Sequence, residues 1–232
     1  MRVARARPMT IAICHSFLSK NAFAFQQPHI LKFPSTYKYS STTRLHLKLT
    51  PEEIAASLGP DRTIASKCFT WDQLQDIVHN GDPTMHSRSM QVQEQYVLHA
   101  REITQSWRSM NDYILYSKFG MDKMEIDVNG ERKFVSCPSL EECKAEQRVE
   151  KRLLFNEYPY FVCEGIEHWC LWKLGGQVTQ KEVDAAIGDL EQRMEKDGHG
   201  ALKDVLTWVN PPHLQSIPDI DHAHLLCLRD SQ

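Results

Sequence analysis

Hydrophobic residues recur at steps of three and four positions between about residue 50 and residue 152, which is the spacing of one face of an α-helix. The pattern predicts a short helix over Thr50–Leu58 and a second helix that begins at Thr70-Trp71-Asp72-Gln73, a capping box. A long helix is predicted from about Met90 to Phe119, and a charged helix from the capping residue Ser139 to about Arg152.

The period then changes toward two, which is the period of a β-strand. Alternating segments predict strands over His168–Leu174 and His222–Leu228, with a helix from Thr179 and a short strand over Val205–Val209 between them. Ile126–Val135 predicts a hairpin that turns at Asn-Gly. We therefore expect an α+β fold, in which a helical N-terminal half packs on a small antiparallel sheet.

The first 48 residues differ from the rest in charge. Eight Lys or Arg residues precede Glu52, the first acidic residue, whereas the whole chain has 27 Lys and Arg against 30 Asp and Glu. An acid-free segment with Arg, Ser and Thr is typical of an organelle transit peptide. We expect residues 1–48 to be a disordered, cleaved leader to a plastid or mitochondrion, and residues 49–232 to form a single domain. Without a functional leader, the protein would be cytoplasmic.

Composition excludes several classes of function. The chain is 41% hydrophobic and 25% charged, as in soluble globular proteins. It has no apolar run of the roughly 18 residues that a membrane span needs. The acidic body after residue 48 lacks the basic surface that displaces counterions from nucleic acid. We therefore expect neither a membrane nor a nucleic-acid partner, and the oligomeric state stays open.

The cysteines do not predict a structural site. There are seven, an odd number, and no two of them form a C-x-x-C motif. Neither a zinc site nor a disulfide framework is expected from this pattern. We expect reduced and mostly buried thiols.

The predicted last strand carries the strongest candidate chemistry. His222 and His224 are two positions apart, so both imidazoles lie on the same face of the strand. His168 begins the other Trp-rich strand and reaches the same site if the two strands are neighbours. Two or three imidazoles can act on one phosphate group or hold one metal ion.

Polar and aromatic residues precede both strands. Asn, Gln, Ser and Tyr side chains next to histidines are suited to holding a phosphate group and stabilising its charge. The candidate ligand-binding residues are Asn156, Tyr158, Tyr160, Asn210 and Gln215, and Ser216 joins the three histidines as a candidate catalytic residue. A metal site made by the histidines with Asp219 or Asp221 remains an alternative, although no cofactor is expected.

Two segments resemble the signature blocks of a largely fungal and algal family of unknown function, which includes the fungal N-acetylglucosamine-induced protein. They are Asn156-Glu157-Tyr158-Pro159-Tyr160 with Gly165 to Trp172, and Trp208 to His224. The resemblance covers roughly residues 68–229, with its signature region at 153–229. The family implies no reaction.

The same residues distantly resemble the histidine-triad nucleotide hydrolases and transferases. The shared order is a Tyr-Pro-Tyr loop, a His that opens a strand, a helix, an Asn, a Gln-Ser pair and His-x-His. The resemblance implies a histidine-triad-like C-terminal half in which His224 attacks phosphorus, Ser216 lies near the leaving group and His168 helps to hold the phosphate. The ligand would be a nucleotide or another small phosphorylated molecule.

This chain departs from the triad pattern in three places. Leu226 stands at the third triad position, five residues separate Ser216 from His222, and two residues separate Gly165 from His168. Three hypotheses therefore remain open. They are hydrolysis or transfer at a degenerate histidine-triad site, a non-catalytic binding or scaffold protein, and a histidine-based metal site.

Overall fold

The computed structural model describes residues 48–58, 63–80, 87–198, 200–211, 215 and 217–230. All of them fall within the unit His46–Gln232. Apart from Lys48, the leader predicted from the sequence lies outside the described residues and stays a prediction. No helix among the described residues is long and apolar enough to cross a membrane.

Six helices occur among the described residues. They are α1 (Pro51–Ala56), α2 (Trp71–Asn80), α3 (Met90–Ser106), α4 (Met110–Phe119), α5 (Leu140–Ala145) and α6 (Gln180–Asp197). The capping boxes predicted for the starts of α2 and α5 are both formed. These side chains bond backbone N–H groups that have no partner within the helix, so the polar signals fix where the helices begin.

The prediction of one helix over Met90–Phe119 was wrong, because the chain leaves the helical conformation at Trp107. This residue is extended, with φ −114° and ψ 147°, and Ser109 caps a new helix by accepting a bond from the Asp112 N–H. Trp107 is buried and forms a bridge with Phe134, and the Arg108 N–H donates to the Phe134 carbonyl at 2.9 Å. Packing against the neighbouring hairpin therefore overrides the helical periodicity.

That hairpin confirms the Asn-Gly prediction and is longer than expected. Strands β1 (Asp122–Val128) and β2 (Glu131–Cys137) pair antiparallel along their whole length. Asn129 and Gly130 both have positive φ, 55° and 86°, as a type I′ turn requires.

The main sheet has four strands, β3 (Glu150–Phe155), β4 (Ile166–Leu174), β5 (Leu202–Val209) and β6 (Asp221–Arg229). Their order is β3-β4-β6-β5, and every neighbouring pair is antiparallel. The fold is therefore α+β, as predicted. The predicted helix to Arg152 was wrong in its second half, because α5 ends at Ala145 and the chain turns at Gln147, with φ 51°, before entering β3.

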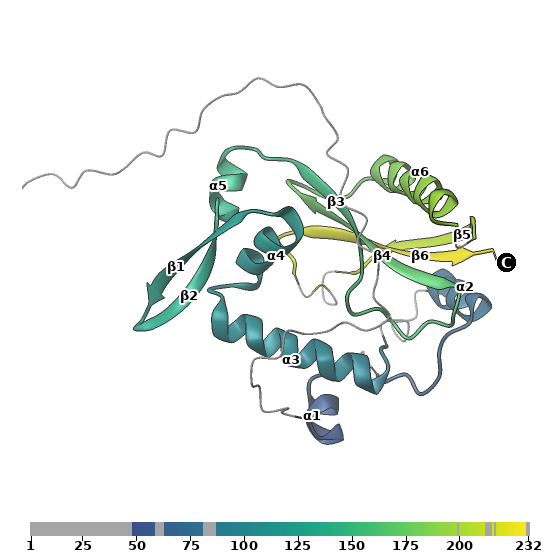
Figure 1. Ribbon diagram of the computed structural model, residues 1–232, viewed down its shortest axis with the longest axis horizontal. Helices are drawn as coiled ribbons and strands as arrows, with labels where there is room; N and C mark the ends of the chain where they lie inside the picture. The colour runs from purple at the N-terminus through teal and green to yellow at the C-terminus, as the bar shows by residue number, and fades with distance from the viewer. Residues whose placement is uncertain are drawn as a thin grey trace, which may run out of the picture. The chain divides into compact units, whose positions relative to one another are not determined.

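The two faces of this sheet are covered by different helices (Figure 1). Ala223, Leu225 and Cys227 of β6 pack in a core with Leu190 and Met194 of α6. The alternate residues of β6 point the other way, toward the side of α3 and α4. The face that carries the histidines therefore lies between the sheet and these two helices.

One cysteine expectation was wrong, because Cys68 and Cys163 form a disulfide with a Cα–Cα distance of 5.0 Å. A parallel bridge between Phe69 and Val162 brings the two segments together, and no sequence spacing indicates it. Cys143, Cys170 and Cys227 are free and buried, as expected, and Cys137 is free and exposed. The disulfide anchors the segment that follows Tyr160.

We expect Cys68→Ser to lower the free energy of unfolding by about 2–5 kcal/mol, because the bond closes a loop between residues 95 apart in sequence. Urea unfolding under oxidising conditions measures this loss. Reductant should bring the wild type to the stability of the variant and leave the variant unchanged. Cys137→Ser, which removes an exposed free thiol, is the control. Equal stability of Cys68→Ser and wild type would contradict the prediction.

Candidate functional site

The pairing of β4 with β6 brings His168 and His224 into direct contact. The register places His168 opposite Leu226 and Cys170 opposite His224, so all four side chains lie on one face. His168 Nε2 is 2.9 Å from His224 Nδ1. The side chains are almost completely shielded, with exposed fractions of 0% for His168 and 5% for His224. Because a buried imidazole needs hydrogen-bond partners, the contact couples the two rings.

The loop between β3 and β4 holds His168 from the other side. The Tyr160 backbone N–H donates to His168 Nδ1 at 3.2 Å, and the Asn156 N–H donates to the His168 carbonyl oxygen at 2.8 Å. Asn156 Oδ1 accepts the Tyr158 N–H at 3.0 Å, which shapes the loop. Asn156, Tyr158 and Tyr160, three of the predicted ligand-binding residues, therefore shape the loop that positions His168.

His224 is held at its second nitrogen by a residue that follows β5. Asn210 Nδ2 is 3.1 Å from His224 Nε2, and Asn210 Oδ1 accepts the Trp208 indole N–H at 3.0 Å. The Trp208 ring also stacks on the His224 ring, with centroids 5.1 Å apart and an interplanar angle of 12°. Since an indole N–H can only donate, it orients the Asn210 amide so that its NH₂ faces His224 Nε2.

These contacts give the histidine pair two proton arrangements. If the Tyr160 N–H bond sets the tautomer, His168 Nε2 carries the shared proton and donates it to His224 Nδ1. If the Asn210 bond sets the tautomer, His224 Nε2 presents a lone pair and Nδ1 carries the shared proton. Going from the first arrangement to the second changes the proton position on both rings, and only the second arrangement leaves a lone pair on His224 Nε2 for nucleophilic attack.

Cys170 completes a cluster of three possible metal ligands. The ligand atoms of His168, Cys170 and His224 all lie within 4.8 Å of one another. A metal-bound histidine normally donates its other N–H to an acceptor. Here the outer nitrogens face donors, the Tyr160 N–H and the Asn210 NH₂ group, so the cluster fits a metal ion poorly. Burial also raises the pKa of the Cys170 thiol to about 12, which keeps it protonated.

The acidic residues of the metal hypothesis have other partners. Asp219 accepts a bond from Asn111 at 2.9 Å and lies 3.7 Å from Lys144. Asp221 accepts the Val178 N–H at 2.7 Å, at the segment that leads into α6. The structure therefore does not bring either carboxylate to the histidine pair.

His222 lies beside the pair, on the same face of β6. Its ring stacks on Trp172 with centroids 4.4 Å apart, and its centroid is 5.1 Å from that of His224. Burial lowers the pKa of His222 below its ordinary value, more than the Ile220 carbonyl and Asp221 raise it. His222 is therefore a neutral imidazole at pH 7, available as a hydrogen-bonding group.

A cavity of about 130 Å³ opens in front of these histidines. The sheet contributes Cys170, Trp172, His222 and His224 to its wall, and α3, α4 and the β3–β4 loop form the opposite side. Among the described residues, Arg88 and Lys118 are the cations that line it. Arg88 donates to the Tyr158 carbonyl at 2.9 Å and lies 4.4 Å over the Tyr96 ring, and Lys118 pairs with Glu157 at 2.8 Å.

The predicted site residues are largely gathered here. His222, His224, Asn156, Tyr158, Tyr160 and Asn210 line the cavity. His168 lies behind His224, and Gln215 donates to the Asn210 carbonyl at 2.8 Å. Ser216, predicted to lie near the leaving group, is outside the described residues.

Sequence reasoning missed His99, which faces the cavity from α3. His99 Nε2 is 3.0 Å from the Tyr113 hydroxyl, and its Nδ1 contacts the Tyr158 hydroxyl. A signal was available, because His99 lies three residues after Tyr96 and four before Ile103, two residues that define the inner face of the predicted helix.

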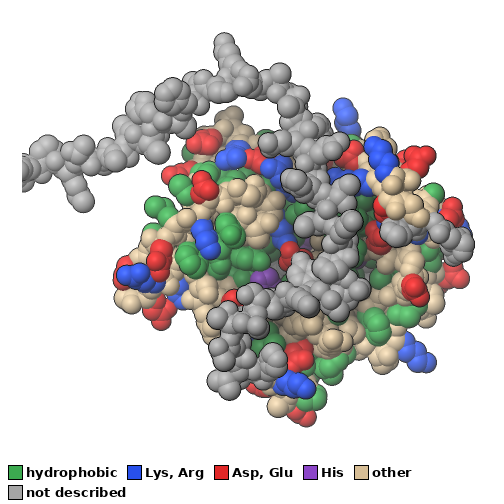
Figure 2. All heavy atoms as spheres, viewed as in Figure 1, with side chains coloured by type: hydrophobic (Ala, Val, Ile, Leu, Met, Phe, Trp, Pro, Cys, Tyr) green, Lys and Arg blue, Asp and Glu red, His purple; other side chains and the backbone are tan. Residues whose placement is uncertain are grey.

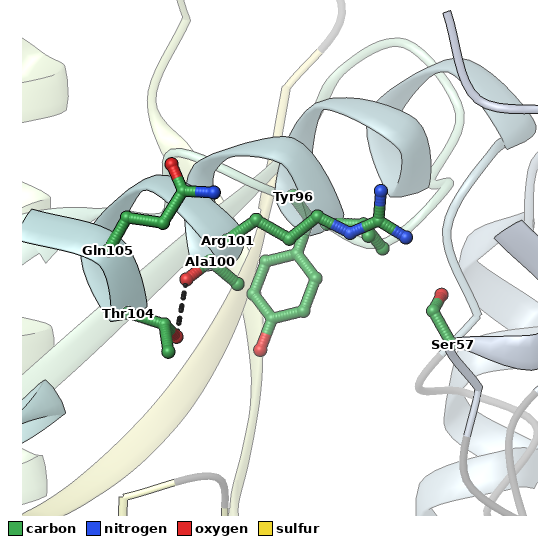
Figure 3. Close-up of a pocket in the computed structure, with 7 residues that line it drawn as sticks. Ser57, Tyr96, Ala100, Arg101, Thr104 and Gln105 are labelled. Carbon is green, nitrogen blue, oxygen red and sulfur yellow. Dashed lines mark hydrogen bonds between the residues drawn. The ribbon is translucent and has the colours of Figure 1, made fainter. Parts of the chain in front are cut away.

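A separate, open hollow of about 370 Å³ lies along α3 (Figure 3). Tyr96, Arg101 and Gln105 line it from the helix, and Ser57 lies across from them. The Thr104 hydroxyl donates to the Ala100 carbonyl at 2.9 Å, so its hydrogen bond is made within α3. Among its described lining residues none has an imidazole, thiol or carboxylate, so it offers less chemistry than the histidine cavity.

The surface charge of the described residues is mixed. On the face shown in Figure 2, acidic and basic side chains are interspersed around hydrophobic ones. Binding to nucleic acid relies on a continuous basic surface. This face therefore gives no support to a nucleic-acid partner.

Comparison with known proteins places most of this region in a family. A family model described as "Protein of unknown function (DUF3605)" matches residues 70–228. An uncharacterized protein of Saccharomyces cerevisiae, YPL067C, is 26% identical over 168 residues, which cover 68% of this chain and 78% of the relative. N-acetylglucosamine-induced protein 1 of Candida albicans is 24% identical over 176 residues, which cover 68% of this chain and 67% of the relative.

One solved structure is also similar in part. The structure described as "Crystal Structure of HTC1" is 22% identical, with a TM-score of 0.44, and the match covers 70% of this chain and 86% of that chain.

Two histidines with lowered pKa values predict how stability depends on pH. Burial is the main cause that lowers the pKa values of His222 and His99 below 6.5. Between about pH 7 and 5 the unfolded chain therefore binds more protons than the folded protein does. As a result, the free energy of unfolding falls as pH falls. His222→Gln should weaken this dependence in urea unfolding at pH 7, 6 and 5. His79→Gln, at an exposed position of α2, should retain it. Equal slopes for wild type and His222→Gln would contradict the assignment.

Proposed function

The chain belongs to the DUF3605 family of proteins of unknown function, and from that premise we propose that it is a phosphate-ester hydrolase or transferase. In this proposal a small phosphorylated molecule binds in the cavity, and His224 Nε2 attacks its phosphorus atom. The observation that carries the proposal is the fixed position of His224 at the cavity wall. One ring nitrogen contacts His168 at 2.9 Å, and the other contacts Asn210 at 3.1 Å.

The Asn210 contact favours the reactive form of His224. An NH₂ group that donates to Nε2 needs a lone pair there, and a lone pair is what a nucleophile uses. In that form Nδ1 carries a proton that can be shared with His168 Nε2. When Nε2 bonds to phosphorus, the imidazole becomes positively charged. In the second of the two proton arrangements described above, His168 Nε2 then accepts the Nδ1 proton in a hydrogen bond and stabilises that charge.

The reaction balances as a double displacement. The Nε2 lone pair forms a bond to phosphorus, the bond from phosphorus to the leaving oxygen or nitrogen breaks, and the leaving group takes a proton from solvent water. Water or an acceptor hydroxyl then attacks the phosphorus, and the electron pair of the P–N bond returns to His224. One difficult displacement is thereby divided into two easier ones.

The cavity wall suits an anionic ligand of limited size. Arg88 brings positive charge to the wall, Lys118 adds a second cation that is paired with Glu157 at 2.8 Å, and His222 adds a hydrogen-bonding imidazole. The volume of about 130 Å³ is below the roughly 300 Å³ at which pockets for drug-sized ligands begin. We therefore expect the phosphate end of a ligand and a small leaving group to enter, and a dinucleotide to bind poorly.

The order of the site elements supports a histidine-triad type of reaction. The Tyr158-Pro159-Tyr160 loop is followed by His168 in β4, then by α6, by Asn210 after β5 and by His222-Ala223-His224 in β6. The relatives supply no reaction of their own. The name of the Candida albicans protein refers to induction by N-acetylglucosamine.

A second candidate is ligand binding without turnover, and Leu226 favours it. This residue stands at the third triad position, is completely buried and lies opposite His168 in the sheet. Leucine can neither donate a proton nor stabilise charge there. In this alternative the same cavity holds a phosphorylated ligand and leaves it intact.

We expect the wild-type protein to form an acid-labile phosphohistidine-type adduct with a small ³²P-labelled phosphoramidate, because a P–N bond to His224 is the first product. His224→Ala should remove the adduct, and the exposed-site variant His79→Gln should retain it. Quenching at short times with alkaline detergent, which preserves a P–N bond, followed by gel autoradiography, measures the adduct, and acid treatment of a matched sample should remove the label. If His224→Ala forms the adduct in equal yield, His224 is not the nucleophile.

The second candidate predicts a different result in a binding experiment. Trp208 stacks on His224 and Trp172 on His222, so a ligand at the histidines should change tryptophan fluorescence. Saturable quenching by inorganic phosphate or the phosphoramidate, without adduct or turnover, would establish binding alone. Trp208→Phe should reduce the signal. Absence of both fluorescence change and adduct would reject both candidates.

A further inference from the structure

The helix side of the cavity carries a second acid–base group that the function proposed above does not yet use. His99 of α3 contacts two phenol hydroxyls, Tyr113 of α4 and Tyr158 of the β3–β4 loop. We propose that His99 acts through Tyr158 as the general base that activates water, or an acceptor hydroxyl, in the second half of the reaction. This inference rests on the proposed function and adds the residues that complete the turnover.

The three side chains form a continuous hydrogen-bonded chain. His99 Nε2 lies 3.0 Å from the Tyr113 oxygen, and His99 Nδ1 lies 2.5 Å from the Tyr158 oxygen. The rings pack edge to face or tilted, with centroids 5.3 Å apart for His99 and Tyr113 and 5.5 Å for His99 and Tyr158. All three residues line the cavity. A neutral imidazole donates from one nitrogen and accepts at the other, so it can link two hydroxyls.

Tyr158 connects this chain to the histidines of the sheet. It lies two residues before Tyr160, whose ring centroid is 5.7 Å from that of His224 and 4.6 Å from that of His168. Arg88 holds the loop by donating to the Tyr158 carbonyl and by placing its guanidinium over the Tyr160 ring. The nucleophile and the proposed base therefore face one small cavity from opposite walls, which is the arrangement that a double displacement requires.

The surroundings of His99 suit a base. Burial lowers its pKa, so the imidazole is neutral and able to accept a proton near pH 7. Glu157 and Glu102 act in the opposite direction and favour the imidazolium once it forms, whereas Lys118 opposes it. The Lys118 ammonium is paired with the Glu157 carboxylate at 2.8 Å, which moderates both charges.

The step balances in atoms and protons. The oxygen of water forms a bond to the phosphorus of the His224 adduct, and the P–N bond breaks with its electron pair returning to His224 Nε2. The water proton passes to the Tyr158 oxygen while the Tyr158 hydroxyl proton passes to His99 Nδ1. His99 Nε2 keeps its proton and donates it to the Tyr113 oxygen. His99 ends as an imidazolium, which releases its proton to solvent when the product leaves.

The experiment follows the adduct instead of overall turnover. Wild type, His99→Gln, Tyr158→Phe and the exposed-site control His79→Gln are loaded with labelled phosphoramidate, freed of excess reagent, and sampled over time. We expect the adduct to form in all four. Its decay should slow by about 100-fold in His99→Gln and Tyr158→Phe, the scale of general-base catalysis, and stay at the wild-type rate in His79→Gln.

The pH dependence separates a base from a residue that only supports the fold. Wild-type adduct decay should rise with pH as His99 loses its proton and then reach a plateau, whereas His99→Gln should lose this step. Circular dichroism and urea unfolding check that the variants are folded, and Tyr158→Phe repeats the test if His99→Gln is not.

The outcomes also separate this inference from the proposed function. Adduct that forms and decays at the wild-type rate and pH profile in both variants would overturn the role of His99 and leave His224 as the nucleophile. Absence of adduct in the wild type itself would overturn both.

Discussion

The pairing of β4 with β6 is the constraint on which the rest of the structure depends. In an antiparallel pair each cross-strand neighbour points to the same face, so one register decides the surroundings of every side chain. The observed register places Leu171 with Ala223 on the α6 face and Cys170 with His224 on the cavity face. A shift of one residue would bury imidazoles against α6 and expose apolar side chains to the cavity. The apolar core under α6 therefore fixes the position of the histidines.

The face of the sheet that carries the histidines buries polar side chains, whereas the face under α6 buries apolar ones. His168, His222 and His224 are buried, and burial of polar groups is costly unless each has hydrogen-bond partners. Those partners come from different segments: the Tyr160 backbone N–H for His168, the Asn210 amide for His224 and the Ile220 carbonyl for His222. The Trp208 indole in turn holds the Asn210 amide. Because several contacts must form together, they hold the rings in defined orientations. Such preorganisation is what a reacting group needs, and it also explains why these loops are anchored by Arg88 and by the Cys68–Cys163 disulfide.

The sequence predicted those features that depend on local pattern. The alternation in His222-Ala223-His224 is a property of any strand, and the Asn-Gly turn and the capping boxes act within four residues. The errors arose where distant segments compete with local preference. Trp107 leaves the helix because it packs on Phe134, and Glu150–Phe155 becomes a strand because β4 offers its open edge. Neither the disulfide nor the contact of His99 with Tyr158 follows from spacing, since both join segments more than 50 residues apart.

The structure also changes how the leucine at position 226 bears on the role of His224. In the resemblance to the histidine-triad pattern, Leu226 stands where a third imidazole would be expected along the strand. In space, His168 of the neighbouring strand lies opposite Leu226 and reaches diagonally to His224 Nδ1. Three imidazoles are therefore gathered at one face from two strands, with His222 on one side of His224 and His168 on the other. A fourth imidazole at position 226 would add a buried polar group beside His168, whose two nitrogens already contact the Tyr160 N–H and His224. An apolar side chain there is compatible with an active His224, because the contact to Nδ1 that a nucleophilic imidazole needs comes from β4.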